Sequence, residues 1–221
     1  MHKGIALSAA VKKIPDGSSL MIGGFMGIGS PHRLIDELVR QGREGLTVIA
    51  NDTARPGFGI GLLIDAKLVR TLVVSHIGTN PETQRQMIAS EIEVDLVPQG
   101  TLAERIRAAG YGLGGVLTST GVGTLVAEGA QSIEVAGRIF LLALPIAAGF
   151  ALIGAHRADY LGNLSYALTA RNFNPIMAMA ATTVVAEAAE IVPVGVMPPD
   201  DVITPGSIVD HLVEREIVNG R

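Results

Sequence analysis

Short apolar runs alternate with amphipathic segments along most of the chain. Leu20–Ile22 is apolar without interruption, as in a strand buried on both faces, and residues 34–39 then carry apolar side chains at helical spacing. Further strands are predicted at Leu46–Ala50, Thr71–Ser75, Val94–Val97, Phe140–Leu144, Phe150–Gly154 and Thr182–Ala186. Helices are predicted at residues 5–14, 31–41 and 62–67, from Pro81 onward, after Gly100 and near 208–213. This alternation predicts an α/β fold, with one domain over residues 1–221 and a mainly parallel sheet covered by helices on both faces.

The stretch Ile139–Ala155 has 17 residues without a charge, near the lower limit for a membrane-spanning helix. Pro145, Gly149 and Gly154 divide it into pieces of about five residues, the usual length of a strand. We therefore interpret it as two core strands.

A glycine loop, residues 23–30, separates the first of these strands from its helix. Glycines at 23, 24, 27 and 29 permit positive φ angles and the close approach of a ligand. Ser30 suits the N-cap and Pro31 the first helical position, and a helix N-terminus behind such a loop suits a phosphate or carboxylate. No G-x-G-x-x-G fits, since His32 stands where the third glycine belongs, and no Gly-Lys-Ser/Thr occurs. A tight turn without a ligand explains the glycines equally well.

Polar or glycine-rich clusters follow four predicted strands, at residues 23–30, 51–53, 75–80 and 98–101. Ligands of parallel sheets lie beyond the carboxyl ends of the strands, so we expect these clusters to build one site. Residues 110–129 form a further glycine tract with hydroxyl side chains. It is either a mobile loop or a backbone wall against an extended ligand, and we favour the wall.

Composition narrows the function classes. The chain of 221 residues is 48% hydrophobic and has 27 glycines, which favours a compact α/β protein with a sizeable core. A net charge of −4 and a pI near 5.7 argue against a nucleic-acid surface. The absence of cysteine excludes disulfides, thiolate metal sites and cysteine catalysis. No signal peptide is visible in the sequence, and we expect a cytoplasmic protein.

Gln99 is the leading polar candidate for chemistry. A neutral carboxamide at a strand end can donate to a developing oxyanion without adding a charge that would trap a carboxylate substrate. The capping-box pattern Thr101–Glu104 predicts a helix that starts directly after Gln99 and Gly100. Asn51, at the end of the second strand, is the next candidate. From the residues alone, a glutamine bonded within its own turn is the simpler interpretation of Gln99, and a capping or turn role explains Asn51 equally well.

The other titratable side chains give weaker indications of a catalytic role. His76 has no carboxylate placed by the sequence to orient it, and a packed loop histidine is the simpler interpretation. The carboxylates Glu82, Glu91, Glu93 and Asp95, and the pair His156 and Arg157, are interpreted as solvated, capping or loop charges. The five histidines show no paired ligand spacing, so no metal is implied.

Several motifs together resemble the alpha subunit of family I coenzyme A transferases. Between Asp16 and Pro31 the chain has Asp-Gly, three apolar residues, Gly-Gly-Phe and Gly-x-Pro, which is the glycine signature of that family. The similarity covers essentially residues 4–213, and the string at residues 75–83 looks most like the acetate/acetoacetate, short-chain fatty acid branch. Further matching segments are Ala50–Thr53, Val97–Arg107, Gly121–Thr124 and Ala170–Pro175.

The resemblance implies a fold of the NagB/RpiA-like type and a ping-pong transfer of coenzyme A from an acyl thioester to a free carboxylate. The nucleophile of the family is a glutamate in a Ser-Glu-Asn-Gly motif of the beta subunit, and no Glu-Asn-Gly occurs here. We therefore expect an inactive chain that needs a beta subunit in a hetero-oligomer, with a coenzyme A thioester as substrate and no permanently bound cofactor. Gln99 is expected to polarise the acyl group. The residues expected to line the substrate site are Gly24, Phe25, Met26, Gly27, Gly29, Asn51 and Gly100.

Residues 146–154 depart from the family, because an acidic residue expected before Ala-Leu-Ile is replaced by Gly149-Phe150. That puts an ion pair or part of a subunit contact there in doubt. The alternatives are a 3-oxoadipate transferase alpha subunit, a sugar-phosphate isomerase or effector-binding module with phosphate at residues 23–30, and a non-catalytic scaffold subunit.

Overall fold

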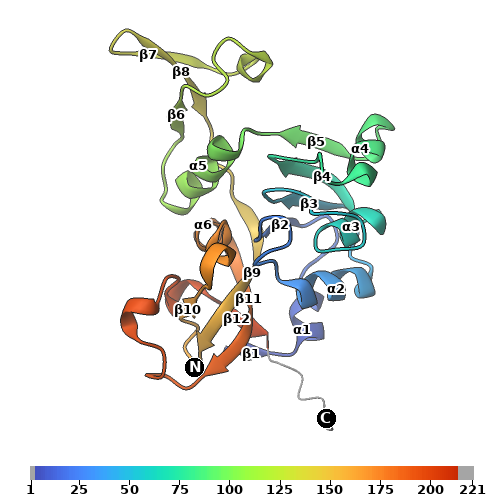
Figure 1. The fold of residues 1–221 in the computed structure, drawn as a ribbon, viewed down its shortest axis with the longest axis vertical. Helices are drawn as coiled ribbons and strands as arrows, with labels where there is room; N and C mark the ends of the chain where they lie inside the picture. Colours follow the sequence, from blue (N-terminus) through green and yellow to red (C-terminus); the bar gives the residue numbers. More distant parts are fainter. Residues whose placement is uncertain (1–2, 214–221) are drawn as a thin grey trace.

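The computed structural model describes residues 3–213, and its centre is a nine-stranded sheet with the order β1-β12-β11-β9-β2-β3-β4-β5, with β10 paired to β9 (Figure 1). Every neighbouring pair along that order is parallel, and only β10 runs antiparallel to β9. The strands are β1 Gly4–Ile5, β2 Ser19–Ile22, β3 Leu46–Ile49, β4 Val69–Val74, β5 Glu93–Leu96, β9 Ala148–Asp159, β10 Leu164–Ser165, β11 Ala181–Val192 and β12 His211–Val213. The predicted mainly parallel sheet is confirmed.

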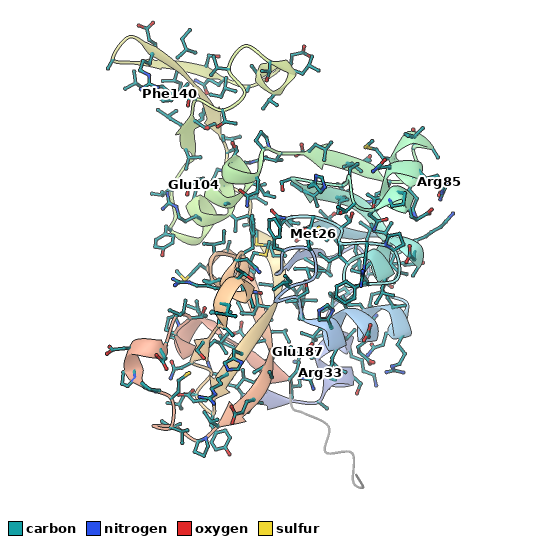
Figure 2. All side chains as sticks on the ribbon, viewed as in Figure 1. Met26, Arg33, Arg85, Glu104, Phe140 and Glu187 are labelled. Atoms are coloured by element: carbon teal, nitrogen blue, oxygen red, sulfur yellow. The ribbon has the colours of Figure 1, made fainter. Side chains whose placement is uncertain are left out.

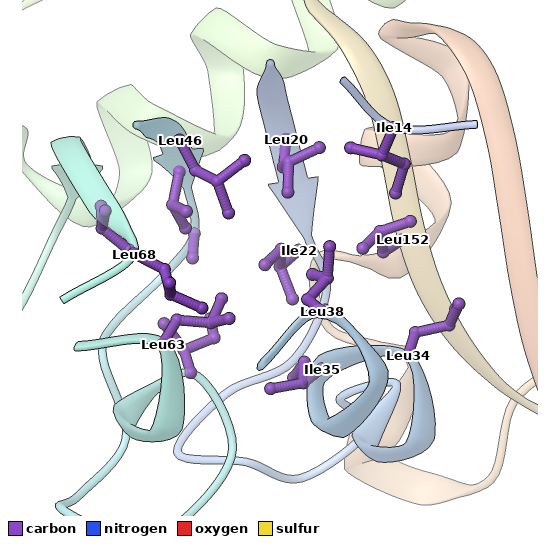
Figure 3. Packing of buried hydrophobic residues seen from close by; sticks show 14 of the residues in the cluster. Ile14, Leu20, Ile22, Leu34, Ile35, Leu38, Leu46, Leu63, Leu68 and Leu152 are labelled. Atoms are coloured by element: carbon purple, nitrogen blue, oxygen red, sulfur yellow. The ribbon is translucent and has the colours of Figure 1, made fainter. Parts of the chain in front are cut away.

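Helices cover both faces of this sheet, as predicted. They are α1 Leu7–Lys12, α2 His32–Gln41, α3 Gly61–Asp65, α4 Pro81–Ile88, α5 Gln99–Gly110 and α6 Asn174–Met179. Alternate side chains of β2 face opposite layers, because successive residues of a strand point to opposite faces. Leu20 and Ile22 pack in the apolar cluster shared with α1, α2 and α3 (Figure 3), whereas Met21 packs in the cluster shared with α5 and α6.

A second, three-stranded sheet projects from the body as an arm (Figure 1). Its antiparallel strands β6 Val116–Thr118, β8 Arg138–Ala143 and β7 Ser132–Val135 lie in that order, with a 3-10 turn at Leu125–Ala127. The glycine tract 110–129 therefore links α5 to the arm and forms part of it. The predicted strand Phe140–Leu144 exists, but it lies in the arm and not in the core, because it pairs with β6 and β7.

Two predicted helix positions are wrong. Helix α5 begins at Gln99, because the Leu102 N–H already donates to the Pro98 carbonyl, so the capping box at Thr101 does not form and the Thr101 hydroxyl is buried without a hydrogen-bond partner. Residues 208–213 form the end of a 3-10 turn and then strand β12, which pairs with β1 and β11. Pairing between distant strands overrides the local helical pattern there.

Within the described chain, no helix is long and apolar enough to span a membrane.

Candidate functional site

The loops after β2, β3 and β4 meet at the carboxyl edge of the sheet. The Met26 N–H in the first loop donates to the Asp52 carboxylate in the second, at 2.8 Å. Asp52 forms a parallel bridge to His76 in the third loop, and the Thr79 hydroxyl donates to the Ala54 carbonyl at 2.8 Å. The predicted convergence of residues 23–30, 51–53 and 75–80 is therefore observed.

The glycine loop is a tight, hydrogen-bonded turn. Phe25 and Ile28 exchange two backbone bonds, at 3.0 and 2.9 Å, and Met26 between them has a positive φ of 51°. A Cβ on Gly27 would lie 2.1 Å from the Phe58 ring, so this glycine is required for packing between the first two loops. The Phe25 side chain is 45% exposed. The loop thus carries an exposed apolar side chain on a backbone fixed by its own hydrogen bonds, and its contact with a ligand stays a prediction.

Asn172 and Asn174 hydrogen-bond to the other side of this loop, a contact that the sequence did not predict for the segment Ala170–Pro175. The Gly24 N–H donates to the Asn172 carboxamide oxygen at 3.2 Å, and the Asn172 amide donates to the Ile28 carbonyl at 2.9 Å. The Asn174 amide donates to the Gly29 carbonyl at 3.0 Å. The Asn-x-Asn spacing was the available signal, but the sequence does not show which loop it contacts.

Asn51 is 2% exposed, and its carboxamide is used inside the chain. Its oxygen accepts from the Ser75 hydroxyl at 3.1 Å, and its amide donates to Asp52 at 2.8 Å. These bonds fix the orientation of the carboxamide behind the glycine loop. Contact between Asn51 and an acyl group stays a prediction.

Gln99 has a different environment. It is the first residue of α5, its side chain is exposed, and no hydrogen bond engages it among the described residues. Strand β5 brings it to the same edge as the other loops, since the Val97 N–H donates to the Val74 carbonyl at 2.9 Å. Gly100 beside it is exposed, and a Cβ there would meet no atom within 4 Å. The carboxamide of Gln99 is therefore unengaged within the described residues, and its action on an acyl group stays a prediction.

A groove of about 660 Å³ runs between the start of α5 and the arm. Val97, Pro98 and Thr101 line one side, next to Gln99, and Leu125 and Leu142 of the arm line the other. The glycine tract contributes Thr118 and Thr120 among its lining residues. Contact between the tract and a ligand stays a prediction.

The N-terminus of α2 is already occupied by a carboxylate of the chain itself. The helix begins at His32 after Pro31, one residue later than predicted, and no Ser30 side-chain cap forms. Instead, Glu187 of β11 accepts from the backbone N–H groups of Arg33 and Leu34, at 3.3 and 3.0 Å, and pairs with the Arg33 guanidinium at 3.2 Å (Figure 2). The predicted anion site at this N-terminus is therefore filled by Glu187, which the sequence places more than 150 residues away.

The remaining titratable candidates lie outside this cluster or on its rim. His76 is exposed at the end of β4. Glu82 of α4 and Glu91, just after that helix, both pair with Arg85, and hydrogen bonds from its guanidinium lower the pKa of both carboxyls to about 2. Within residues 3–213 there is no group of three His, Cys, Asp or Glu side chains that could hold a metal ion.

Residues 146–154 form the start of β9 and the turn before it. Gly154 lies against the glycine loop, where a Cβ would be 2.4 Å from the Gly29 carbonyl oxygen. The Gly149 N–H donates to the Ser19 hydroxyl at 2.9 Å. Contacts within this chain therefore account for both glycines. An effect of this departure on a subunit contact stays a prediction.

Comparison with known proteins identifies the relatives of this chain. Residues 5–215 match the family model described as Coenzyme A transferase. The chain is 54% identical over 198 residues to acetate CoA-transferase subunit alpha of Escherichia coli K12, covering 90% of each chain. It is 48% identical over 200 residues to the acetoacetyl-CoA:acetate/butyrate CoA transferase alpha subunit of Clostridium acetobutylicum, covering 90% of this chain and 92% of that one.

The fold is shared with solved structures. An acyl-CoA transferase of Escherichia coli O157:H7 superposes with a TM-score of 0.86 at 23% identity. The match covers 97% of this chain and 47% of that chain, so this chain spans about half the length of that relative. With the fold and the family model in agreement over nearly all of the described residues, the chain belongs to the coenzyme A transferase family.

Proposed function

We propose that this chain is the alpha subunit of a short-chain acyl-CoA:carboxylate coenzyme A transferase of the acetate/acetoacetate or butyrate type. The observation that carries the proposal is a free carboxamide, Gln99, beside a rigid cluster of strand-end loops in a chain 54% identical to an acetate CoA-transferase alpha subunit. A beta subunit completes the enzyme as a hetero-oligomer, since the two relatives compared above are themselves named alpha subunits.

The proposed chemistry divides the labour between two chains. A glutamate of the beta subunit attacks the thioester carbonyl, and coenzyme A leaves as a thiolate while a mixed acyl anhydride forms. The thiolate then attacks the glutamyl carbonyl and releases the first carboxylate, which leaves a glutamyl-coenzyme A thioester. An incoming carboxylate reverses both steps. The Gln99 amide donates to the oxyanion that forms on the thioester carbonyl, a role in which a neutral donor is effective.

The glycine loop and Gly100 form the chain's own part of the substrate site in this proposal. Gly24, Phe25, Met26, Gly27 and Gly29 bound the acyl end of the thioester, and Asn51 supports them from behind. The reaction needs no permanently bound cofactor in this scheme, and a cytoplasmic location is part of the proposal. Subcellular fractionation tests the location.

The sugar-phosphate alternative is disfavoured by a specific contact. Its phosphate would bind at the N-terminus of α2, where Glu187 already accepts from the Arg33 and Leu34 N–H groups. A second anion at that place would face a carboxylate, which repels it.

Reconstitution tests the proposal. The purified chain alone is expected to give no exchange of labelled acetate into acetoacetyl-coenzyme A, and co-expression with the beta subunit restores the exchange. Borohydride trapping of the thioester intermediate then labels the beta subunit and not this chain. Full activity of this chain alone, or preference of the complex for 3-oxoadipate over acetate and butyrate, would overturn the proposed function.

A further inference from the structure

Asp52 lies in the loop after β3, where its carboxylate faces the glycine loop, and 4% of its surface is exposed. One carboxylate oxygen accepts from the Met26 N–H and from the Asn51 amide, each at 2.8 Å, and the other accepts from the Ala54 N–H at 2.7 Å. Every partner is a donor. Both oxygens must therefore be acceptors, a requirement that an ionised carboxylate meets and a carboxamide does not.

Two of those donors belong to residues in an unfavourable backbone conformation. Met26 has a φ of 51° and Ala54 a φ of 50°, in the left-handed region that L-residues other than Asn and Asp rarely adopt. Such residues persist where surrounding contacts fix them, and they are often found at functional sites. Here a single carboxylate binds the N–H groups of both.

The position of Met26 sets the tip of the glycine loop. Met26 stands between Phe25 and Ile28, which close the turn by their two backbone bonds. Its sulfur lies 3.5 Å from the Thr79 hydroxyl in the loop after β4. Figure 2 shows Met26 near the centre of the molecule. Movement of Met26 would therefore displace the Phe25 side chain and break the contact between Met26 and Thr79, which joins the first and third loops.

We propose that Asp52 is a positioning residue of the transfer reaction, which holds Met26 and Asn51 in the arrangement that the acyl thioester requires. This inference rests on the proposed function. Asp52 is buried and its oxygens are occupied, so it acts through these two neighbours and not by contact with the substrate.

Asp52→Asn hardly changes the volume of the side chain, but it replaces one of the two acceptor oxygens by an NH2 donor. If the new carboxamide turns its oxygen to Met26 and Asn51, its NH2 group faces the Ala54 N–H. If it turns the other way, the NH2 group faces two donors. Either orientation leaves at least one buried donor without a partner, which is costly.

Asp159, the last residue of β9, provides a matched control. It is also 4% exposed, and one of its oxygens accepts from the N–H groups of Leu161 and Asn163, at 2.9 and 3.0 Å. The other oxygen accepts from the Asn163 amide at 2.8 Å. Asp159→Asn therefore disturbs the same number of hydrogen bonds around a buried carboxylate, in a turn outside the candidate site whose Tyr160 and Leu161 are exposed.

The test uses the co-expressed complex with its beta subunit and compares three variants. Asp52→Asn is expected to lower kcat for acetate exchange by roughly 10²-fold, the loss typical of a misplacement of about 1 Å, and to change KM for the thioester less. Asp159→Asn is expected to lower the melting temperature to a similar degree and to keep kcat within about twofold of wild type. The double variant Asp52→Asn/Ala54→Gly relieves strain at residue 54 and is expected to regain stability but not kcat.

Amide hydrogen exchange of residues 24–30 in the same complexes gives a readout that does not depend on turnover. Faster exchange in Asp52→Asn, and not in Asp159→Asn, is expected even if the wild-type complex proves to catalyse another reaction, which would overturn the proposed function alone. The inference is overturned if Asp52→Asn keeps kcat within twofold, if Ala54→Gly restores kcat together with stability, or if exchange in residues 24–30 is unchanged.

Discussion

The two walls of the candidate site differ in how much of their geometry the chain fixes by itself. The first wall, made by the loops after β2, β3 and β4, has buried and hydrogen-bonded polar side chains, such as Asn51, Asp52 and Asn80. The second wall, made by the start of α5 and the arm, has an exposed Gln99 without a hydrogen-bond partner in the described chain. It also has an arm whose Leu125 is 82% exposed.

This difference indicates which part of the site is preorganised within this chain and which part a partner chain could complete. A site stabilises a transition state best when its groups are already in place, and the first wall meets that condition within one polypeptide. The second wall presents an open groove and unpaired groups, which a partner chain can engage. Under the proposed function, the rigid wall positions the thioester, and the open wall is where substrate and beta subunit meet.

Gln99→Ala in the assembled enzyme tests the open wall most directly. We expect kcat to fall by about 10²–10³, the usual loss when one oxyanion donor is removed. Gln99→Glu keeps the size but replaces the donor by a negative charge, so it is expected to be at least as slow. Because Gln99 is exposed, the unfolding free energy of either variant should stay within about 0.5 kcal/mol of wild type. A normal rate in Gln99→Ala would remove the oxyanion role.

Gly27→Ala tests the rigid wall through its packing. Both Gly27 and Gly57 have positive φ, but a Cβ on Gly27 would meet the Phe58 ring at 2.1 Å and one on Gly57 would meet nothing within 4 Å. Gly57→Ala is expected to cost only the backbone strain, about 1–2 kcal/mol. Gly27→Ala adds an overpacking cost, for a total of about 2–5 kcal/mol in urea unfolding. Equal losses of unfolding free energy in the two variants would show that the contact between the first two loops adjusts to an added methyl group without cost.

Local signals explain what the sequence predicted well. The strand-loop-helix unit around residues 20–41 depends on an apolar run, glycines and helical spacing. The helix predicted from Pro81 onward does begin at Pro81, and the Asn80 side chain caps it by accepting from the Glu82 and Thr83 N–H groups. The convergence of the strand-end loops followed from the parallel sheet alone. Three of the four clusters are now joined by direct contacts, and residues 98–101 lie at the same edge.

Contacts between distant residues explain what the sequence could not predict. Glu187 caps α2 across more than 150 residues, and Asn172 binds Gly24 across 148. No periodicity or motif in a single sequence states which carboxylate or amide crosses the sheet. The arm was missed for a related reason. After Arg138, its strand β8 is apolar like a core strand, and only its pairing with β6 and β7 places it outside the body.

Leu125→Gln has the smallest expected effect on stability, and it tests whether the arm packs against the rest of the chain. Leu125 is almost fully exposed on the arm, so its replacement removes little buried apolar surface, and the unfolding free energy should change by no more than about 0.5 kcal/mol. Leu20→Ala in the core is the contrasting variant, with an expected loss of about 2–5 kcal/mol, because Leu20 is fully buried in the apolar cluster shared with α1, α2 and α3. Urea unfolding of both variants measures the difference. A loss above about 1 kcal/mol in Leu125→Gln would mean that the arm packs on the body in solution. The groove between the arm and α5 would then be filled by this chain and not left for a partner.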